Sequence, residues 1–500
     1  DGIGVSFQLL NDSIHVVEVI SGGPAEKVGM LAGDIIIKVD DKPSTGDTIK
    51  NDWVFKHLRG KKGTKVEVSV IRGNNKKPIV FKITRDKIPL NSIDTWFMID
   101  KEIGYIKLDR FAQQSNDELV NALNELKKEG MVDLILDLRS NGGGYLKTAF
   151  EICDQFLSGN KLIVYTQGLK SAREELKAEK RGIFETGRLV IMVDEFSASA
   201  SEILSGAVQD WDRGVIVGRR TFGKGLVQRP FDLYDKSQIR LTTSRYYTPS
   251  GRCIQKPYED GVEEYQQDYN KRLSHGELTN ADSIHFADSL RYYTAGNRVV
   301  YGGGGIMPDI FVPIDTSRAS DYLINLRSKG LFNNYSLKWV EEHREDFLKK
   351  APTYKDFSKE YEKLNLLKDF EKYAEQEGVK RTEVKKEWVN KIILDYLQKE
   401  TSDSLSDSYD SYVDYAKMLT SEDKLLKEVI SKAEQEDEKA KQINKDSEKY
   451  IASTLKALIA RNLYGVKYYY MTVFENDKEL KEAIDVLKDK KRYTEILKKK

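Results

Sequence analysis

The sequence predicts an α/β multi-domain protein with three consecutive regions: a β-rich module over residues 1–87, an α/β region over 88–315 and an all-α region over 316–500. Short apolar runs broken by glycine and proline fill the first region, and strands alternate with helical patterns in the second. All ten prolines lie at or before Pro352, and only two glycines follow it, so the last region has almost no helix breakers.

The composition excludes several classes of protein. The 81 Lys and Arg residues balance 80 Asp and Glu residues, so the chain has no basic surplus for binding nucleic acid. No apolar run approaches the roughly 18–20 residues that span a bilayer, so we expect no transmembrane segment. Two cysteines and five scattered histidines predict neither a disulfide scaffold nor a metal site.

The first region reads as short strands joined by turns. Its opening loop, Gly2-Ile3-Gly4-Val5, can turn consecutive backbone N–H groups toward an anion, and the strand that follows can accept an added peptide strand. Together with Gly23-Pro24-Ala25-Glu26-Lys27 and Ala32-Gly33-Asp34-Ile35-Ile36, this loop resembles a PDZ domain. The resemblance implies that Gly2, Ile3, Gly4 and Val5 bind the free C-terminal carboxylate of a protein or peptide.

In the second region, strands and helices alternate from Ile103 onward, which predicts several parallel strands. Buried strands are expected at 132–138, 189–193 and 214–218, and each leads into a loop rich in glycine or serine. These loops cover residues 139–144, 197–202 and 221–225. Ligands bind at such strand ends in α/β folds, so we expect the functional site there. Residues 258–300 are polar and are expected to be an irregular insertion.

The segment Ser197-Ala198-Ser199-Ala200-Ser201-Glu202-Ile203, followed by Thr221-Phe222-Gly223-Lys224-Gly225-Leu226-Val227-Gln228, resembles the carboxyl-terminal processing protease family. Members of this family are serine endopeptidases with a PDZ domain and a crotonase/ClpP-like core, and they need no cofactor. The resemblance covers residues 1 to about 315. By motif position, Ser199 matches the nucleophile and Lys224 the general base.

Other roles carry over from the same motifs. Gln228 matches a residue that positions the lysine in some members, and Asp210 an acidic residue implicated in others. The backbone N–H groups of Ala200 and of Gly142 or Gly143 match the oxyanion hole. The resemblance further implies cleavage near protein C-termini in the periplasm or cell envelope of a Gram-negative bacterium. A homo-oligomer or a regulatory partner is left open.

A serine–lysine dyad sets a physical requirement. The serine hydroxyl becomes a nucleophile only when a base takes its proton, and a neutral amine does this. An ordinary lysine titrates near 10.4, so work near neutral pH requires burial among apolar groups, for which Phe222, Leu226 and Val227 are candidates. The Gln228 amide is a candidate hydrogen-bond acceptor.

Structural alternatives remain for each candidate. Ser199 and Glu202 also form a capping box at the start of a helix. Lys224 fits a solvated loop lysine, Gly142–Gly144 a flexible turn, and Asp210 a solvated carboxylate at a helix end. The stretch Gly218–Gly225 imitates a phosphate-binding loop, but Gly225 replaces the required Ser or Thr and a strand-like segment follows, which excludes nucleotide binding. A catalytically inactive PDZ adaptor is the alternative function.

The third region reads as helical, with one apolar stripe over residues 388–397 and another over 451–463. We expect both stripes to be core rather than partner grooves. The region is expected to pack on the core, gate the cleft or mediate oligomerisation. The chain starts at Asp1 without a methionine or a targeting pattern, so we expect residues upstream of it.

Overall fold

The computed structural model describes residues 1–10, 12–20, 22–46, 49–73, 77–179, 181–258, 261–315, 320–381 and 424–498. The chain folds into two compact units, each made of two separate stretches: Asp1–Pro89 with Asp315–Val473, and Leu90–Ile314 with Phe474–Lys500. The predicted fold class is confirmed: a β-rich N-terminal region, an α/β core and a C-terminal helical region. Among the described residues, no helix combines the length and apolar character that crossing a bilayer requires.

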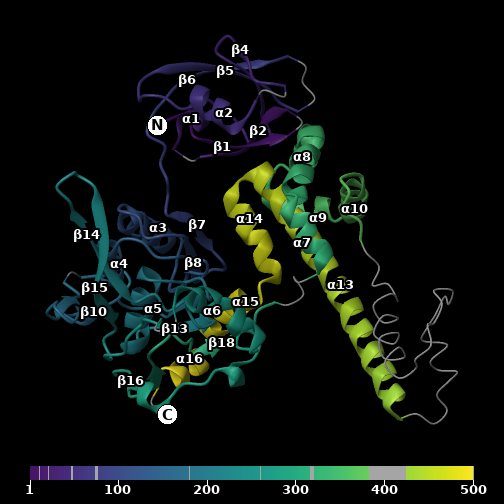
Figure 1. Ribbon diagram of the computed structural model, residues 1–500. Coiled ribbons are helices and arrows are strands. Elements are labelled where there is room, and N and C mark those ends of the chain that lie inside the picture. The colour runs from purple at the N-terminus through teal and green to yellow at the C-terminus, as the bar shows by residue number, and fades with distance from the viewer. Residues whose placement is uncertain are drawn as a thin grey trace. The chain divides into compact units, whose positions relative to one another are not determined.

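The first unit begins with a sheet in the order β1-β2-β3-β5-β6, with β4 paired to β3 (Figure 1). The strands are β1 (Val5–Leu10), β2 (Ser13–Val19), β3 (Ile35–Val39), β4 (Lys42–Pro43), β5 (Lys65–Ile71) and β6 (Ile79–Thr84), and the helices are α1 (Pro24–Lys27) and α2 (Asn51–Leu58). Alternating apolar residues such as Val66, Val68 and Val70 point into one core, as a strand period of two requires. Strand β1 lies at the edge of the sheet.

Helices complete this unit. They are α7 (Asp321–Ser328), α8 (Leu331–Lys350), α9 (Tyr354–Tyr361), α10 (Leu366–Gln376), α13 (Lys424–Tyr464) and α14 (Val466–Val473). The predicted stripe at 451–463 is core, since Ile451, Leu455 and Ile459 are fully buried. The stripe at 388–397 lies outside the described residues. Gln8 donates to Asn334 at 2.7 Å and Arg344 donates to the Ala32 carbonyl at 2.5 Å, which joins these helices to the β-rich part within the unit.

The second unit contains a sheet in the order β18-β13-β12-β9-β8-β7, which is parallel except for the β7–β8 pair. Its strands are β7 (Ile93–Met98), β8 (Ile103–Leu108), β9 (Asp133–Asp137), β12 (Leu189–Val193), β13 (Val215–Gly218) and β18 (Ile310–Phe311). Strands β9, β12 and β13 are buried along their full length, which explains their near-continuous apolar sequence. The predicted parallel strands are therefore confirmed.

The helices of this unit are α3 (Ser115–Lys128), α4 (Leu146–Cys153), α5 (Ala200–Asp210), α6 (Val262–Ser274), α15 (Lys478–Lys488) and α16 (Lys490–Ile496). The unit also contains three short 3₁₀ turns, η1 (Ala281–Ser283), η2 (Asp288–Leu290) and η4 (Phe474–Asn476), and a strand pair, β16 (Arg291–Tyr293) and β17 (Val299–Tyr301). The expectation that residues 258–300 are irregular is wrong in part, because they contain α6 and β16.

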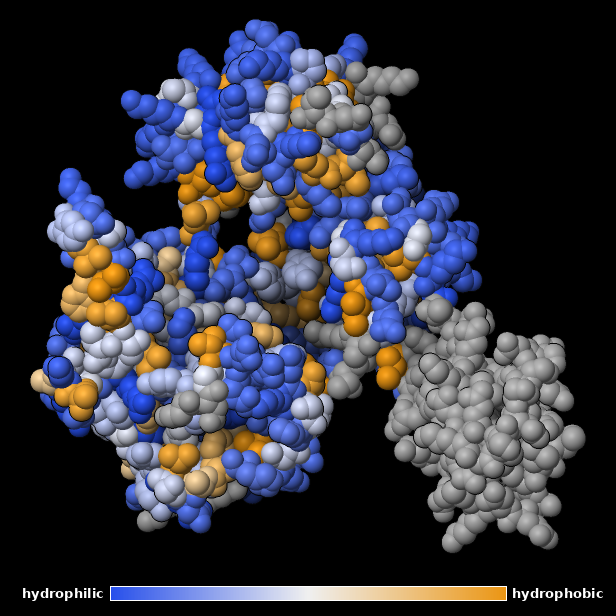
Figure 2. Space-filling view, viewed as in Figure 1, coloured by the Kyte–Doolittle hydropathy of each residue, from blue (hydrophilic) through white to orange (hydrophobic). Residues whose placement is uncertain are grey.

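A second sheet of this unit is antiparallel, in the order β11-β10-β15-β14. Its strands are β10 (Leu162–Gln167), β11 (Glu174–Lys177), β14 (Leu226–Asp232) and β15 (Gln238–Tyr247). The β14–β15 hairpin projects from the unit with exposed apolar side chains at Phe231, Ile239 and Leu241, seen as the orange group at the left of Figure 2. The hairpin starts at Leu226, so it continues directly from residues 221–225, the loop that carries Lys224 and is called the lysine loop below.

Candidate active site

Ser199 lies at the turn between β12 and α5, immediately before the first helical residue. Its backbone has φ 57° and ψ −109°, a positive-φ conformation that non-glycine residues rarely adopt. A sharp turn of this kind between a strand and a helix lifts a side chain clear of the backbone, as the nucleophile turn of hydrolases does. The predicted position of Ser199 at a strand-to-helix turn is therefore confirmed.

The Glu202 carboxylate connects Ser199 with the lysine loop. The side chain is fully buried, and Oε2 accepts hydrogen bonds at 2.8 Å from the N–H groups of both Ser199 and Lys224. Oε1 accepts from the Gly223 N–H and the Thr221 hydroxyl, each at 2.6 Å. Burial raises the pKa of Glu202, and the four donors oppose that shift. One carboxylate oxygen thus brings the backbones of the predicted nucleophile and base together.

Glu202 therefore accepts more hydrogen bonds than the predicted capping box contains. A capping box explains only its bond to the Ser199 N–H, since the donors of residues 221–224 come from a loop that follows another strand. The sequence carried a signal for the local bond, the Ser-x-x-Glu spacing, but none for the bonds to the lysine loop.

Lys224 itself is exposed, and so is Gln228. Within the part of the chain that the structure describes, the Lys224 amine makes no hydrogen bond to Ser199 or Gln228 and no ion pair. The burial that a neutral lysine requires is thus absent from this structure. The chain continues from Lys224 into β14 rather than into a helix, which agrees with the exclusion of a phosphate-binding loop.

The predicted oxyanion turn, Gly142–Gly144, lies directly against the turn that carries Ser199. A Cβ atom added to Gly143, which has φ +97°, would stand 2.7 Å from the Ala198 carbonyl oxygen and 2.8 Å from Ser199 Cβ, so only glycine fits. The Gly143 N–H already donates to Asn141 Oδ1 at 2.9 Å. Among the described residues, the Gly142 N–H has no acceptor, which makes Gly142 the better donor of the two candidates.

Asn141 holds this turn in place and was not among the predicted site residues. Its side chain is fully buried and donates to the Leu108 carbonyl at 2.8 Å. Its own carbonyl accepts from the Ala198 N–H at 3.0 Å and from the Ser201 hydroxyl at 2.9 Å. The first residue of α5, Ala200, has no preceding turn to accept its N–H, so that group is available beside Ser199.

The structure does not bring Asp210 to Ser199. The two residues lie at opposite ends of α5, a helix of 11 residues and therefore about 15 Å long. The Asp210 carboxylate is fully buried and accepts from Arg252 at 2.7 Å and from the Ser250 N–H at 2.9 Å. The alternative of a solvated carboxylate is wrong, and these contacts support a structural role for Asp210 rather than a direct catalytic one.

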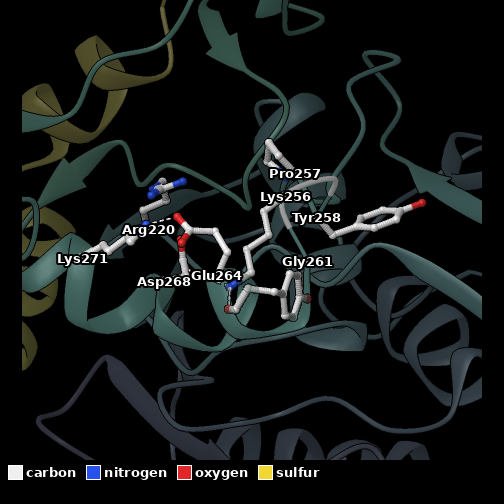
Figure 3. A pocket seen from close by; sticks show the side chains of 9 residues that line it. Arg220, Lys256, Pro257, Tyr258, Gly261, Glu264, Asp268 and Lys271 are labelled. Carbon is white, nitrogen blue, oxygen red and sulfur yellow. Dashed lines mark hydrogen bonds and ion pairs between the residues drawn. The ribbon is translucent and has the colours of Figure 1, made fainter.

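A pocket of about 190 Å³ lies between α6 and residues 256–258, with Arg220 in its lining (Figure 3). The buried Lys256 ammonium is 4.1 Å from the ring centres of both Phe222 and Tyr265 and 2.9 Å from Asp268. Phe222 belongs to the lysine loop and Tyr265 and Asp268 to α6, so Lys256 joins the loop to this helix. Burial lowers the pKa of Lys256, and Asp268 opposes that shift.

The predicted carboxylate-binding loop, Gly2-Ile3-Gly4-Val5, lies in the first unit and leads into the edge strand β1. Gly4 has φ +84°, and the N–H groups of Ile3 and Gly4 donate to no described residue. The Arg59 guanidinium lies over the Phe55 ring at 4.1 Å. The two available N–H groups at the turn are donors that an anion could use.

Comparison with known proteins finds family models that match both regions. Residues 102–265 match the model of peptidase family S41, and residues 2–83 match the PDZ domain model. The chain is 36% identical over 259 residues to the carboxy-terminal-processing protease of Bartonella bacilliformis, covering 51% of this chain and 58% of that protein. The chain belongs to peptidase family S41. Residues 322–388 and 384–465 match a family of unknown function, DUF8443.

Two further proteins match a similar share of this chain. A probable CtpA-like serine protease of Staphylococcus aureus (strain N315) is 34% identical over 51% of this chain and 50% of its own length. The solved structure of a photosystem II D1 C-terminal processing protease is 31% identical over 51% of this chain and 69% of that chain, with a TM-score of 0.31. The chain thus spans little more than half the length of the curated relatives it matches.

Proposed function

We propose that the chain is a serine endopeptidase that cleaves proteins near their C-termini with Ser199 as nucleophile and Lys224 as general base. The observation that carries the proposal is the shared Glu202 oxygen, which accepts a hydrogen bond from the amide of each of these residues at 2.8 Å. Membership of the S41 family supports the same assignment.

In the proposed reaction, the neutral Lys224 amine takes the proton of the Ser199 hydroxyl, and the oxygen attacks the carbonyl carbon of the scissile peptide. The N–H groups of Ala200 and Gly142 would donate to the oxyanion that forms. The protonated Lys224 then gives its proton to the leaving amine, and an activated water hydrolyses the acyl-enzyme. Because Lys224 is exposed here, we expect the bound substrate to cover it and thereby favour the neutral amine.

The test is incubation of the full chain with an unstructured protein in water enriched in ¹⁸O. We expect the substrate to lose C-terminal fragments, and each new carboxylate to carry an ¹⁸O atom because water resolves the acyl-enzyme. Mass spectrometry of the products reads both results. Peptide binding without cleavage under all conditions would favour the alternative, an inactive PDZ adaptor.

We further propose that the PDZ domain binds the free C-terminus of the substrate. The N–H groups of Ile3 and Gly4 and the edge strand β1 support this step, since an added strand would pair with β1 and place its carboxylate at the loop. Peptides and proteins with free C-termini are then the partners. The location in the periplasm or cell envelope stays a prediction of the family resemblance.

Amidation of a peptide's C-terminus is expected to weaken its binding about 10- to 100-fold, because charge-assisted hydrogen bonds of roughly 1.5–3 kcal/mol are lost. Titration calorimetry with the Ser199→Ala chain would measure the affinity without cleavage. Acetylation of the same peptide's N-terminus is the control and should change the affinity less than about twofold. Equal affinities for the amidated and free peptides would contradict carboxylate recognition.

A further inference from the structure

Residues from Phe474 onward pack into the second unit, which contains Ser199 and Lys224 and is called the catalytic unit below. They do not pack with the helices that precede them. The Phe474 ring lies 5.6 Å from Phe97 and 4.6 Å from Tyr105, measured between ring centres. The buried Tyr493 hydroxyl accepts from the Leu189 N–H at 3.0 Å and donates to the Leu189 carbonyl at 3.1 Å. These contacts fix η4 against β7 and β8, and α16 against β12.

On α15, the Glu479 carboxylate joins two arginines that follow different strands. Its Oε2 accepts from Arg139 Nη1 at 2.8 Å, and its Oε1 accepts from Arg219 Nη1. Arg139 lies two residues beyond β9, and Arg219 directly follows β13. The side chains of Glu479, Arg139 and Arg219 are only 12%, 19% and 7% exposed, so the pairs are largely shielded from water.

Each arginine is also anchored to the sheet by a second carboxylate. Arg139 pairs with Asp137 at 2.7 Å, and Arg219 pairs with Glu195, which follows β12, at 2.6 Å. Arg139 also pairs with Asp477, which directly precedes α15, at 2.8 Å. Arg139 is the first residue of the loop 139–144 that contains the predicted oxyanion turn, and the lysine loop begins two residues after Arg219. Glu479 therefore bridges the starting points of the two loops that must keep a fixed distance from Ser199.

We propose that Glu479 is a positioning residue that holds the oxyanion turn and the lysine loop in register through Arg139 and Arg219. The proposal rests on the proposed function of these loops. Removal of the Glu479 charge leaves Arg139 paired with Asp137 and Asp477, and Arg219 paired with Glu195, so each guanidinium group keeps a partner but the carboxylate that links the two is lost. The loops would then separate, and small misplacements of reacting groups lower the rate strongly.

The test compares Glu479→Gln with Glu482→Gln in the full chain. Glu482 lies on the same helix and pairs with Arg492 of α16, so it is a matched loss of charge away from the two arginines. We expect Glu479→Gln to lower kcat at least about tenfold with KM changed less than about twofold. Hydrogen exchange in residues 140–144 and 221–225 should become at least about fivefold faster, and the control should change neither quantity.

Exchange separates this proposal from the proposed function, because it is measurable even if the wild-type chain cleaves nothing. The amides of Ser140, Gly223 and Lys224 are hydrogen-bonded, so their exchange reports the two loops directly. Wild-type exchange in Glu479→Gln would overturn the proposal. If that variant does not fold, Glu479→Asp, whose shorter side chain cannot span both arginines, should show an intermediate increase, and wild-type exchange there would overturn it equally.

Discussion

Replacement of Ser199 by alanine is expected to lower kcat at least about 10⁴-fold, since no other group can form the acyl-enzyme. The fold should be retained, because alanine keeps the Cβ atom and the backbone conformation at φ 57° costs nearly the same for both residues. Initial rates on an unstructured substrate, together with the thermal midpoint of each protein, measure the two effects separately.

Replacement of Lys224 tests the second member of the dyad. Lys224→Met removes the base, and Lys224→Arg keeps the positive charge but cannot lose its proton near neutral pH. Both variants should therefore lose activity to the same extent as Ser199→Ala. Lys236→Met is the control, because Lys236 is an exposed lysine in the turn of the β14–β15 hairpin. Cleavage by the Lys224 variants at the wild-type rate would refute the dyad.

Replacement of Glu202 by glutamine is expected to affect both stability and activity. The amide supplies one acceptor oxygen where the carboxylate supplied two, so its NH₂ group must face donors of Ser199 and Lys224 or of Gly223 and Thr221. Each buried donor left without an acceptor costs about 1–3 kcal/mol, so the free energy of unfolding should fall by about 3 kcal/mol. We also expect kcat to fall about 100-fold, because the two loops lose their common anchor.

Asp210→Asn is the matched control for Glu202→Gln. It weakens the buried pair with Arg252 at the other end of α5 and should lower the free energy of unfolding by about 3 kcal/mol as well. Below the unfolding transition of both variants, Asp210→Asn should keep kcat within about threefold of the wild type. Urea unfolding measures the stability of each variant, and initial rates measure its kcat. An equal loss of kcat in both variants would show that lost stability, not position, explains the Glu202 effect.

Much of the local structure could be predicted from the sequence. Near-continuous apolar runs at 132–138 and 189–193 predicted buried parallel strands, because a strand covered on both faces needs few polar residues. The Ser-x-x-Glu spacing placed Ser199 at the start of a helix, and the glycines at 142–144 predicted a turn. These features depend on neighbouring residues, so a local pattern reveals them.

The side-chain partners of the candidate site could not be predicted in the same way. Asp210 is adjacent to no arginine in the sequence, and its pairing with Arg252 follows from the path of the chain after β15. Lys224 was expected to be buried among Phe222, Leu226 and Val227, but the ring of Phe222 packs on Lys256 and the Lys224 side chain is exposed. Composition around a residue does not tell which way its side chain points.

The sequence by itself determined the order of the three regions, the strand-to-helix turn at Ser199 and the separation of 25 positions between this serine and Lys224. Only the tertiary structure decided that Glu202 accepts from both residues, and that the chain after Val473 returns to the catalytic unit to place Glu479 between two arginines. The physical reason is separation along the sequence. Periodicity and turn preferences depend on residues a few positions apart. The partners of a buried carboxylate come from distant segments that follow neighbouring strands of the folded sheet.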